Sequence, residues 1–228
     1  LLGAAFLMSC SDSGDVPQEP GRSALIIVDM QYDFLPGGAL PATGGDEIVE
    51  VINGLQDQFD LVVATQDWHP EGHDSFASSH PGRNPGEIID LHGLKQELWP
   101  DHAVQESHGA KLAAELDQEN IARVFRKGMD PKVDSYSGFF DNGKRGDTGL
   151  NDYLRSQGVT ELFVVGLALD YCVKFTALDA AHLGFDTTLI VDASRAVNVQ
   201  PNDGADAVQM MRDAGVQVIN SKILLQTR

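Results

Sequence analysis

The sequence predicts an α/β domain in which helices cover both faces of a parallel sheet. From Ser23 onward, short apolar runs alternate with amphipathic stretches, the pattern of repeated strand–helix units. Several of these runs are continuous rather than alternating, which is typical of strands buried on both faces. The 228 residues are enough for one large domain of this class.

The predicted elements can be placed in chain order from the apolar pattern. The strands are residues 24–30, 61–65, 122–126, 162–167, 188–191 and 216–219, and the helices are residues 46–59, 109–116, 147–157, 171–183 and 203–214. Gly158, Gly184 and Gly215 directly follow the last three helices, where a left-handed residue often ends a helix. Residues 69–108 are rich in Gly, Pro, His and Asp, and we expect them to wind irregularly over one edge of the sheet.

The composition narrows the class of partner. The formal net charge is −18, from 34 acidic and 16 basic residues, so a phosphate backbone would be repelled and nucleic-acid binding is disfavoured. Apolar residues make up 42% of the chain, as in ordinary globular proteins, and no stretch has the length and apolarity of a mature membrane span. A small-molecule substrate is the expected partner.

The first 22 residues read as a separate unit. The sequence Leu7-Met8-Ser9-Cys10 resembles a bacterial lipoprotein signal box, and the polar run after it is typical of a flexible tether. We therefore expect residues 1–22 to be a signal remnant and tether, with lipid on Cys10, and residues 23–228 to be a single domain. This predicts an exported protein anchored on the periplasmic side; the alternative is an apolar start on a cytoplasmic enzyme.

Chemically active side chains follow four successive strands. Asp29 closes the apolar run Leu25–Val28 of the first, Asp67 and His69 follow the second, Lys127 the third and Cys172 the fourth. Because the carboxyl ends of parallel strands open at one edge of the sheet, we expect these groups to meet there.

Cys172 is the candidate nucleophile. It stands at a predicted helix start, where the helix dipole and free amides favour a thiolate and could bind an oxyanion. Asp29 could take the thiol proton and return it to a leaving amine, while Lys127 holds both in charged form. The structural alternatives are a buried apolar Cys172 and a simple Asp29–Lys127 ion pair.

A metal site is indicated by Asp67, His69, His73 and His102. Mixed oxygen and nitrogen ligands suit zinc, iron or manganese, and the Asp-x-His spacing places two ligands on one side of an extended segment. For each histidine a surface or capping role is the alternative. Three aromatic residues flank these segments and could form a slot for a flat ring or simply pack in the core: Phe34, Trp99 and Tyr136.

Six short motifs, in this order, resemble those of bacterial nicotinamidases (pyrazinamidases) in the isochorismatase-like cysteine hydrolase superfamily. They are Asp29-Met30-Gln31-x-Asp33-Phe34, Gln66-Asp67-Trp68-His69-Pro70, Trp99-Pro100-Asp101-His102, Arg126-Lys127-Gly128, Asp134-Ser135-Tyr136-Ser137 and Gly166-x-Ala168-x-Asp170-Tyr171-Cys172-Val173. The likeness spans roughly residues 23–221 and is far more specific than any one motif.

The resemblance implies a reaction and its machinery. The implied activity is hydrolysis of nicotinamide to nicotinate and ammonia, a step of NAD salvage in pyridine nucleotide biosynthesis. It would proceed through a cysteine thioester, with the triad Asp29, Lys127 and Cys172 and an oxyanion hole formed by the amides of Ala168 and Cys172. One divalent metal ion, first of all zinc, would be held by Asp67, His69 and His102, and His73 matches a position that is a ligand in some members only.

The resemblance also implies a fold and allows rival functions. The family sheet is six-stranded and parallel with the order 3-2-1-4-5-6, and a cis peptide precedes the alanine of the cysteine motif, here Leu167–Ala168. Two departures are Ala103, where close members often have Cys, and Leu169, where they often have Thr. The alternatives are an amidase for another small amide or a ureido substrate, and a non-catalytic lipoprotein that senses metal or thiol chemistry. An isochorismatase would need neither this Cys nor this metal site.

Overall fold

The computed structural model describes residues 21–226 of the chain. The lipid attachment expected at Cys10 and nearly all of the expected tether lie outside the described residues. Among residues 21–226, no helix combines the length and apolarity needed to cross a membrane.

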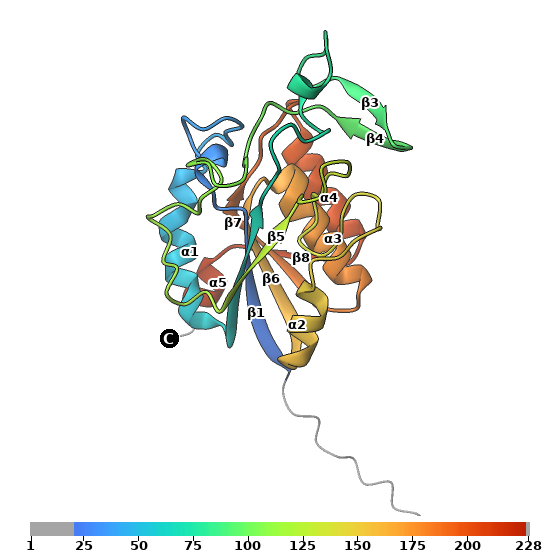
Figure 1. Cartoon of the computed structure of the whole chain (residues 1–228). Helices are drawn as coiled ribbons and strands as arrows, with labels where there is room; N and C mark the ends of the chain where they lie inside the picture. Colours follow the sequence, from blue (N-terminus) through green and yellow to red (C-terminus); the bar gives the residue numbers. More distant parts are fainter. Residues whose placement is uncertain (1–20, 227–228) are drawn as a thin grey trace, which may run out of the picture.

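The centre of the molecule is a six-stranded parallel sheet (Figure 1). Its strands are β1 (Arg22–Val28), β2 (Leu61–Asp67), β5 (Arg123–Lys127), β6 (Val159–Leu167), β7 (Asp186–Arg195) and β8 (Gln217–Ile219). Their order in space is β5-β2-β1-β6-β7-β8, which confirms the expected order 3-2-1-4-5-6. The strands that follow β1 are added first on one side of it (β2, β5) and then on the other (β6, β7, β8). Ligands of such sheets bind beside the carboxyl ends of the strands where this order reverses, here next to β1.

The continuous apolar run of β1 is explained by burial on both faces of the sheet. Ala24, Ile26 and Val28 belong to one core cluster, and Leu25 and Ile27 belong to the other. Successive side chains of a strand point to opposite faces, so a central strand between two helical layers must be apolar at every position.

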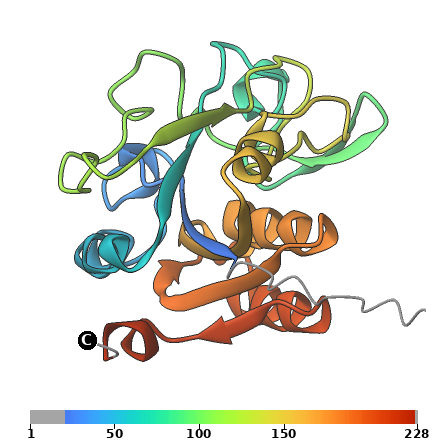
Figure 2. The same ribbon diagram turned by 90° about the horizontal axis from the view of Figure 1, so that it is seen from below.

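Two helical layers complete the three-layer domain, as Figure 2 shows from below. One core cluster lies between the sheet and three helices, α2 (Leu150–Ser156), α3 (Lys174–His182) and α4 (Asp203–Asp213). The other is shared with α1 (Val49–Leu55), and α5 (Lys222–Leu225) packs at its margin. The helix-ending role of Gly158, Gly184 and Gly215 is confirmed by φ angles of +72°, +83° and +89°.

Two expectations about local structure are wrong. Residues 109–116 form no helix, because their backbone pairs instead with the segment after β1: Ala113 N–H donates to the Met30 carbonyl and Tyr32 N–H to the Lys111 carbonyl. The segment expected to be irregular contains an antiparallel hairpin, β3 (Ile88–Leu91) and β4 (Leu94–Glu97), which lies beyond the carboxyl edge of the main sheet (Figure 1).

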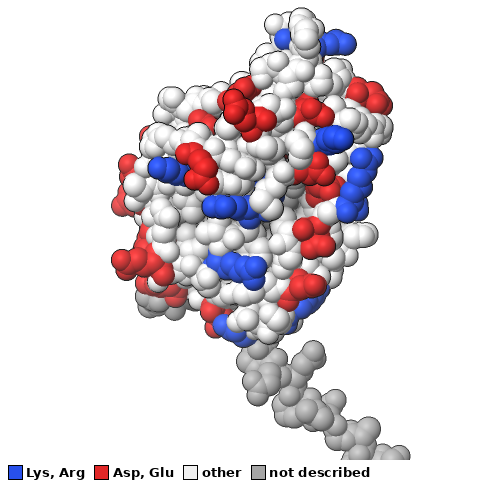
Figure 3. Space-filling model, in the orientation of Figure 1, with Lys and Arg blue, Asp and Glu red and all other residues white. Residues whose placement is uncertain are grey.

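Charged side chains of both signs share the surface. On the face drawn in Figure 3, Lys and Arg side chains lie among Asp and Glu rather than in one continuous basic stripe. A polyanion would therefore meet acidic side chains over much of this face.

Candidate active site

The three candidate triad residues meet at the carboxyl edge of the sheet. Asp29 follows β1 with a φ of +46°, Lys127 is the last residue of β5, and Cys172 lies in a π-helical turn, Leu169–Val173, after β6. The peptide bond between Leu167 and Ala168 is cis, as expected. All three side chains are buried.

Gly166 allows the turn that presents Cys172. Its φ is +112°, and a Cβ atom there would lie 2.2 Å from the carbonyl oxygen of Val28. Any side chain at this position would push β6 away from β1, so a glycine is required where the two strands end together.

Lys127 joins all the reactive groups. Its Nζ donates to Asp67 Oδ1 at 2.9 Å, to the Ser135 carbonyl at 2.8 Å and to Cys172 Sγ at 3.4 Å. It also lies 2.9 Å from Asp29 Oδ2, but without hydrogen-bond geometry, so Oδ2 has no hydrogen-bond partner. An ammonium group has three protons, which these other acceptors use, and Asp29 keeps a free oxygen beside the thiol.

The other oxygen of Asp29 is fixed by Thr65. The Thr65 hydroxyl donates to Asp29 Oδ1 at 2.6 Å. Burial raises the pKa of Asp29 above its ordinary value, although Lys127 and Thr65 act in the opposite direction. A buried carboxylate of raised pKa is a stronger base than an exposed one, which suits a proton acceptor.

Burial and the neighbouring charges act in opposite directions on the thiol and on the ammonium group of the site. Burial raises the pKa of Cys172 well above its ordinary value and outweighs the attraction of Lys127. Burial would lower the pKa of Lys127, but Asp29 and Asp67 raise it well above its ordinary value. The cation is therefore paired with the carboxylates, and burial of the sulfur favours a thiol that keeps its proton until Asp29 takes it.

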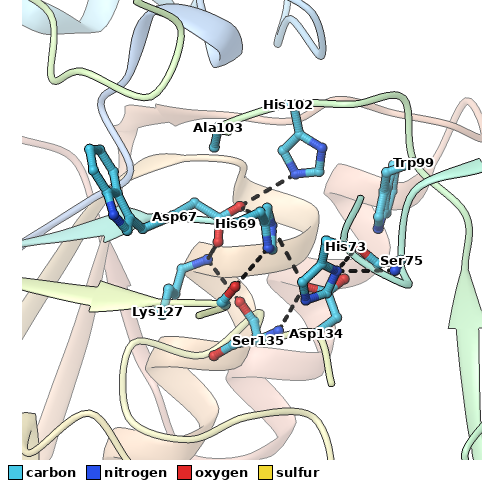
Figure 4. A network of polar contacts seen from close by, with 12 residues as sticks. Asp67, His69, His73, Ser75, Trp99, His102, Ala103, Lys127, Asp134 and Ser135 are labelled. Carbon is cyan, nitrogen blue, oxygen red and sulfur yellow. Dashed lines mark hydrogen bonds and ion pairs between the residues drawn. The ribbon is translucent and has the colours of Figure 1, made fainter. Parts of the chain in front are cut away.

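The candidate metal ligands Asp67, His69 and His102 form one buried cluster, and their ligand atoms lie within 4.8 Å of one another (Figure 4). His69 Nδ1 donates to the Gly128 carbonyl at 2.9 Å, and His102 Nδ1 donates to the Pro100 carbonyl at 2.8 Å. A carbonyl can only accept, so each Nδ1 carries the proton and each Nε2 offers a lone pair.

The Nε2 atoms of His69 and His102 both face the same oxygen of Asp67. Asp67 Oδ2 is 2.9 Å from His69 Nε2 and 3.4 Å from His102 Nε2. His69 Nε2 is buried without a hydrogen-bond partner, which is costly unless an ion satisfies it. Burial would raise the pKa of Asp67, but His69 and Lys127 hold it well below its ordinary value, so the carboxylate is charged. Two imidazoles and one carboxylate fit a divalent transition metal.

His73 stands apart from this cluster, although its place in the sequence made it a candidate ligand. Its Nδ1 accepts from Ser75, at 3.0 Å from the amide nitrogen and 2.8 Å from the hydroxyl, and its Nε2 donates to the Asp130 carbonyl at 2.7 Å. Both ring nitrogens are used, as Figure 4 shows for the contact with Ser75. His73 packs against the ring of His69, with ring centroids 4.4 Å apart, and supports that ligand.

A small cavity unites the two halves of the site. The sequence-predicted aromatic residues Phe34, Trp99 and Tyr136 all line it, beside Cys172 and Ala168. The Phe34 ring meets His102 edge-on with centroids 5.6 Å apart. Flat aromatic walls near a thiol and a metal-type cluster suit a small planar substrate.

Sequence reasoning missed several residues of the site. Asp134 and Tyr171 line the cavity. Both belong to motifs quoted above, but the motifs alone gave them no role. Val197, in the segment after β7, also lines the cavity. The position of Val197 just beyond the fifth strand of the sheet is the signal that could have identified it. Ser135, like Asp134, belongs to one of the six motifs, but the motif gave its carbonyl no role; Thr65 has no sequence signal beyond its position near the end of β2.

Comparison with known proteins agrees with this geometry. The isochorismatase domain model matches residues 23–223. A nicotinamidase of Escherichia coli (strain K12) is 53% identical over 196 residues, which cover 84% of this chain and 92% of that protein. The solved structure of an Acinetobacter baumanii nicotinamidase/pyrazinamidase has a TM-score of 0.87 at 42% identity and covers 91% of this chain and 100% of that one. A Pyrococcus horikoshii pyrazinamidase solved in complex with zinc has a TM-score of 0.70 at 37% identity, covering 87% and 99% of the two chains. The chain belongs to the isochorismatase domain family.

Proposed function

We propose that this protein is an amidohydrolase that converts nicotinamide to nicotinate and ammonia through a thioester on Cys172. The observation that carries the proposal is that Cys172, Asp67 and His102 line one cavity together with aromatic side chains. The resemblance to a nicotinamidase at 53% identity supports the choice of substrate.

The first half of the reaction uses the free oxygen of Asp29. Asp29 Oδ2 accepts the Cys172 proton, and Lys127, 3.4 Å from Sγ, stabilises the thiolate. The sulfur attacks the carboxamide carbon, and the amides of Ala168 and Cys172 receive the oxyanion. Asp29 then returns the proton to the nitrogen, the carbon–nitrogen bond breaks and ammonia leaves.

The second half is hydrolysis of the thioester. Asp29, deprotonated again, takes a proton from water, the hydroxyl oxygen bonds to the acyl carbon and the sulfur leaves. Nicotinate is released and Cys172 recovers its proton. Lys127 keeps its positive charge throughout, because the carboxylates around it hold its pKa high.

Asp67, His69 and His102 would hold one divalent ion, zinc in the first instance and iron or manganese as alternatives. A bound ion would supply Lewis-acid chemistry for the substrate and for water in the cavity beside Cys172. The zinc-bound relative and the unpartnered His69 Nε2 both support this assignment.

Ammonia release from nicotinamide by the purified protein, with and without a chelator, tests the proposal. We expect release that the chelator removes and that added zinc restores. No release from folded, metal-loaded protein would refute the nicotinamidase function, and release from a ureido compound instead would reassign the substrate. Bound metal with no turnover of any amide would favour the sensor alternative.

We also propose that Cys10 carries the lipid anchor of an exported protein. The signal-like sequence Leu7-Met8-Ser9-Cys10 supports this. Mass spectrometry of the mature N-terminus in cells tests it: a diacylated Cys10 would support the anchor, and a mature form with an unmodified Cys10 would rule it out.

A further inference from the structure

The β3–β4 hairpin carries none of the reacting groups, yet it lies against the substrate cavity. It stands outside the six-stranded sheet, beyond its carboxyl edge (Figure 1). Its second strand presents two neighbouring side chains to opposite sides, as any strand does. Gln96 is buried with 2% exposure, and Glu97 is half-buried.

Gln96 holds one aromatic wall of the cavity. Its Nε2 donates to Asp134 Oδ2 at 2.8 Å and lies 3.2 Å from the Tyr136 hydroxyl. That hydroxyl also accepts from Trp99 Nε1 at 3.1 Å. The Gln96 amide is therefore linked directly to the cavity-lining residues Asp134 and Tyr136, and through the Tyr136 hydroxyl to Trp99.

Glu97 holds another wall. The Tyr171 hydroxyl donates to Glu97 Oε2 at 2.7 Å, and the Tyr171 ring meets Trp99 edge-on with centroids 4.8 Å apart. Tyr171 directly precedes Cys172 in the chain and lines the substrate cavity. Tyr171 also lines an outer hollow together with Glu97 and Lys174, whereas Cys172 lines the substrate cavity and not this hollow.

We propose that Gln96 and Glu97 are positioning residues, which fix Tyr136 and Tyr171 as walls of the substrate cavity. The hairpin thereby determines how tightly a flat aromatic amide is held and shields Cys172 from larger reagents. The kinetic consequence rests on the proposed nicotinamidase function; the shielding of the thiol does not. If the hairpin only stabilised the fold, its variants would change neither the KM for the amide nor the reactivity of Cys172.

The decisive variant is Glu97→Ala, compared with Glu97→Gln in the full-length, metal-loaded protein. Glutamine keeps an oxygen that can accept from Tyr171, whereas alanine removes it. Lys95→Ala is the matched control, because Lys95 is exposed on the same strand. Tyr171→Phe removes the same hydrogen bond from its donor side and decides the question if Glu97→Ala does not fold.

The first readout is the rate at which N-ethylmaleimide alkylates Cys172, followed on the Cys172 peptide by mass spectrometry. Loss of one hydrogen bond to a carboxylate corresponds to about a tenfold change in an equilibrium, so we expect labelling about tenfold faster in Glu97→Ala. Glu97→Gln and Lys95→Ala should stay within about twofold of the wild type. Labelling of Glu97→Ala and Tyr171→Phe at the wild-type rate would overturn the proposal.

The second readout separates KM from kcat for nicotinamide. We expect KM to rise about fivefold in Glu97→Ala and in Tyr171→Phe, with no further rise in the double variant, because both remove one contact. A merely structural role would lower the melting temperature and the apparent kcat and leave KM unchanged, which would also overturn the proposal. Wild-type protein that releases no ammonia would refute the nicotinamidase function alone, and alkylation of Cys172 would still decide the role of Glu97.

Discussion

The carbonyl oxygen of Gly128 accepts a hydrogen bond from Nδ1 of His69 at 2.9 Å, and a Cβ atom at Gly128 would lie only 2.5 Å from Cε1 of the same ring. The φ of Gly128 is +66°, a conformation that side chains rarely adopt. One residue thus orients a candidate metal ligand through its carbonyl and makes room for it by having no side chain.

Gly128→Ala is expected to weaken metal binding about 10- to 100-fold, since the ring must move and lose its orienting hydrogen bond. Metal content after dialysis against a graded series of chelator concentrations measures this. Gly149→Ala is the matched control, because its φ of +80° imposes similar backbone strain while no atom lies within 4 Å of the added Cβ. Equal retention of metal by the two variants would contradict the prediction.

His73→Ala is expected to keep a full equivalent of metal, whereas His102→Ala is expected to lose it. Both ring nitrogens of His73 are already engaged by Ser75 and Asp130, so the ion has no lone pair to use there. The unsatisfied partners should cost about 1–3 kcal/mol of stability, seen as a lower melting temperature. Parallel loss of metal in both variants would show that His73 is a ligand after all.

Cys172→Ala is expected to lower kcat by at least about 10⁴-fold while leaving metal binding intact, because the thiol forms the covalent intermediate and is not among the clustered ligands. Rapid quenching of the wild type with nicotinamide, followed by intact-mass measurement, should reveal the acyl-enzyme. Substantial turnover by Cys172→Ala would rule out the thioester.

Thr65→Val is expected to move the acidic limb of kcat/KM to higher pH. Asp29 must be ionised to accept the thiol proton, so activity falls as pH drops through its pKa, which burial places above the ordinary value of 3.8. The Thr65 hydroxyl stabilises the ionised form, and its removal should raise that pKa by about one unit. A pH–rate profile of both proteins between about pH 4 and 8 measures the shift; coincident acidic limbs would disprove the link.

The central strands were predictable from the sequence because they are buried on both faces. The run Leu25-Ile26-Ile27-Val28 has no polar position to obscure it, and its end identified Asp29 as a residue facing the site. The end of β7 was less readable: Asp192, Ser194 and Arg195 extend the strand with polar residues beyond the apolar run, so Val197 was not recognised as a cavity residue.

Long-range contacts decided the elements that sequence reasoning placed wrongly. Ala110, Ala113 and Leu116 are all buried at a spacing typical of a helix, but the backbone between them is held by residues after β1. The hairpin has only short strands and exposes Ile88 at 68%, so it lacks the periodic apolar signal of a strand pair. Neither pairing is visible in the local pattern.

The position of Lys127 makes the two ends of the site thermodynamically dependent on each other. Its ammonium group touches Asp67, whose other oxygen faces the histidines, and it also touches Cys172. An ion bound to Asp67 would offset part of the negative charge of this carboxylate. The positive charge of Lys127 would then stabilise a Cys172 thiolate more strongly and favour loss of the thiol proton. By linkage, ionisation or modification of the sulfur must change the affinity for the ion by the same factor. Measurements of thiol reactivity on this protein therefore have meaning only at a stated metal occupancy.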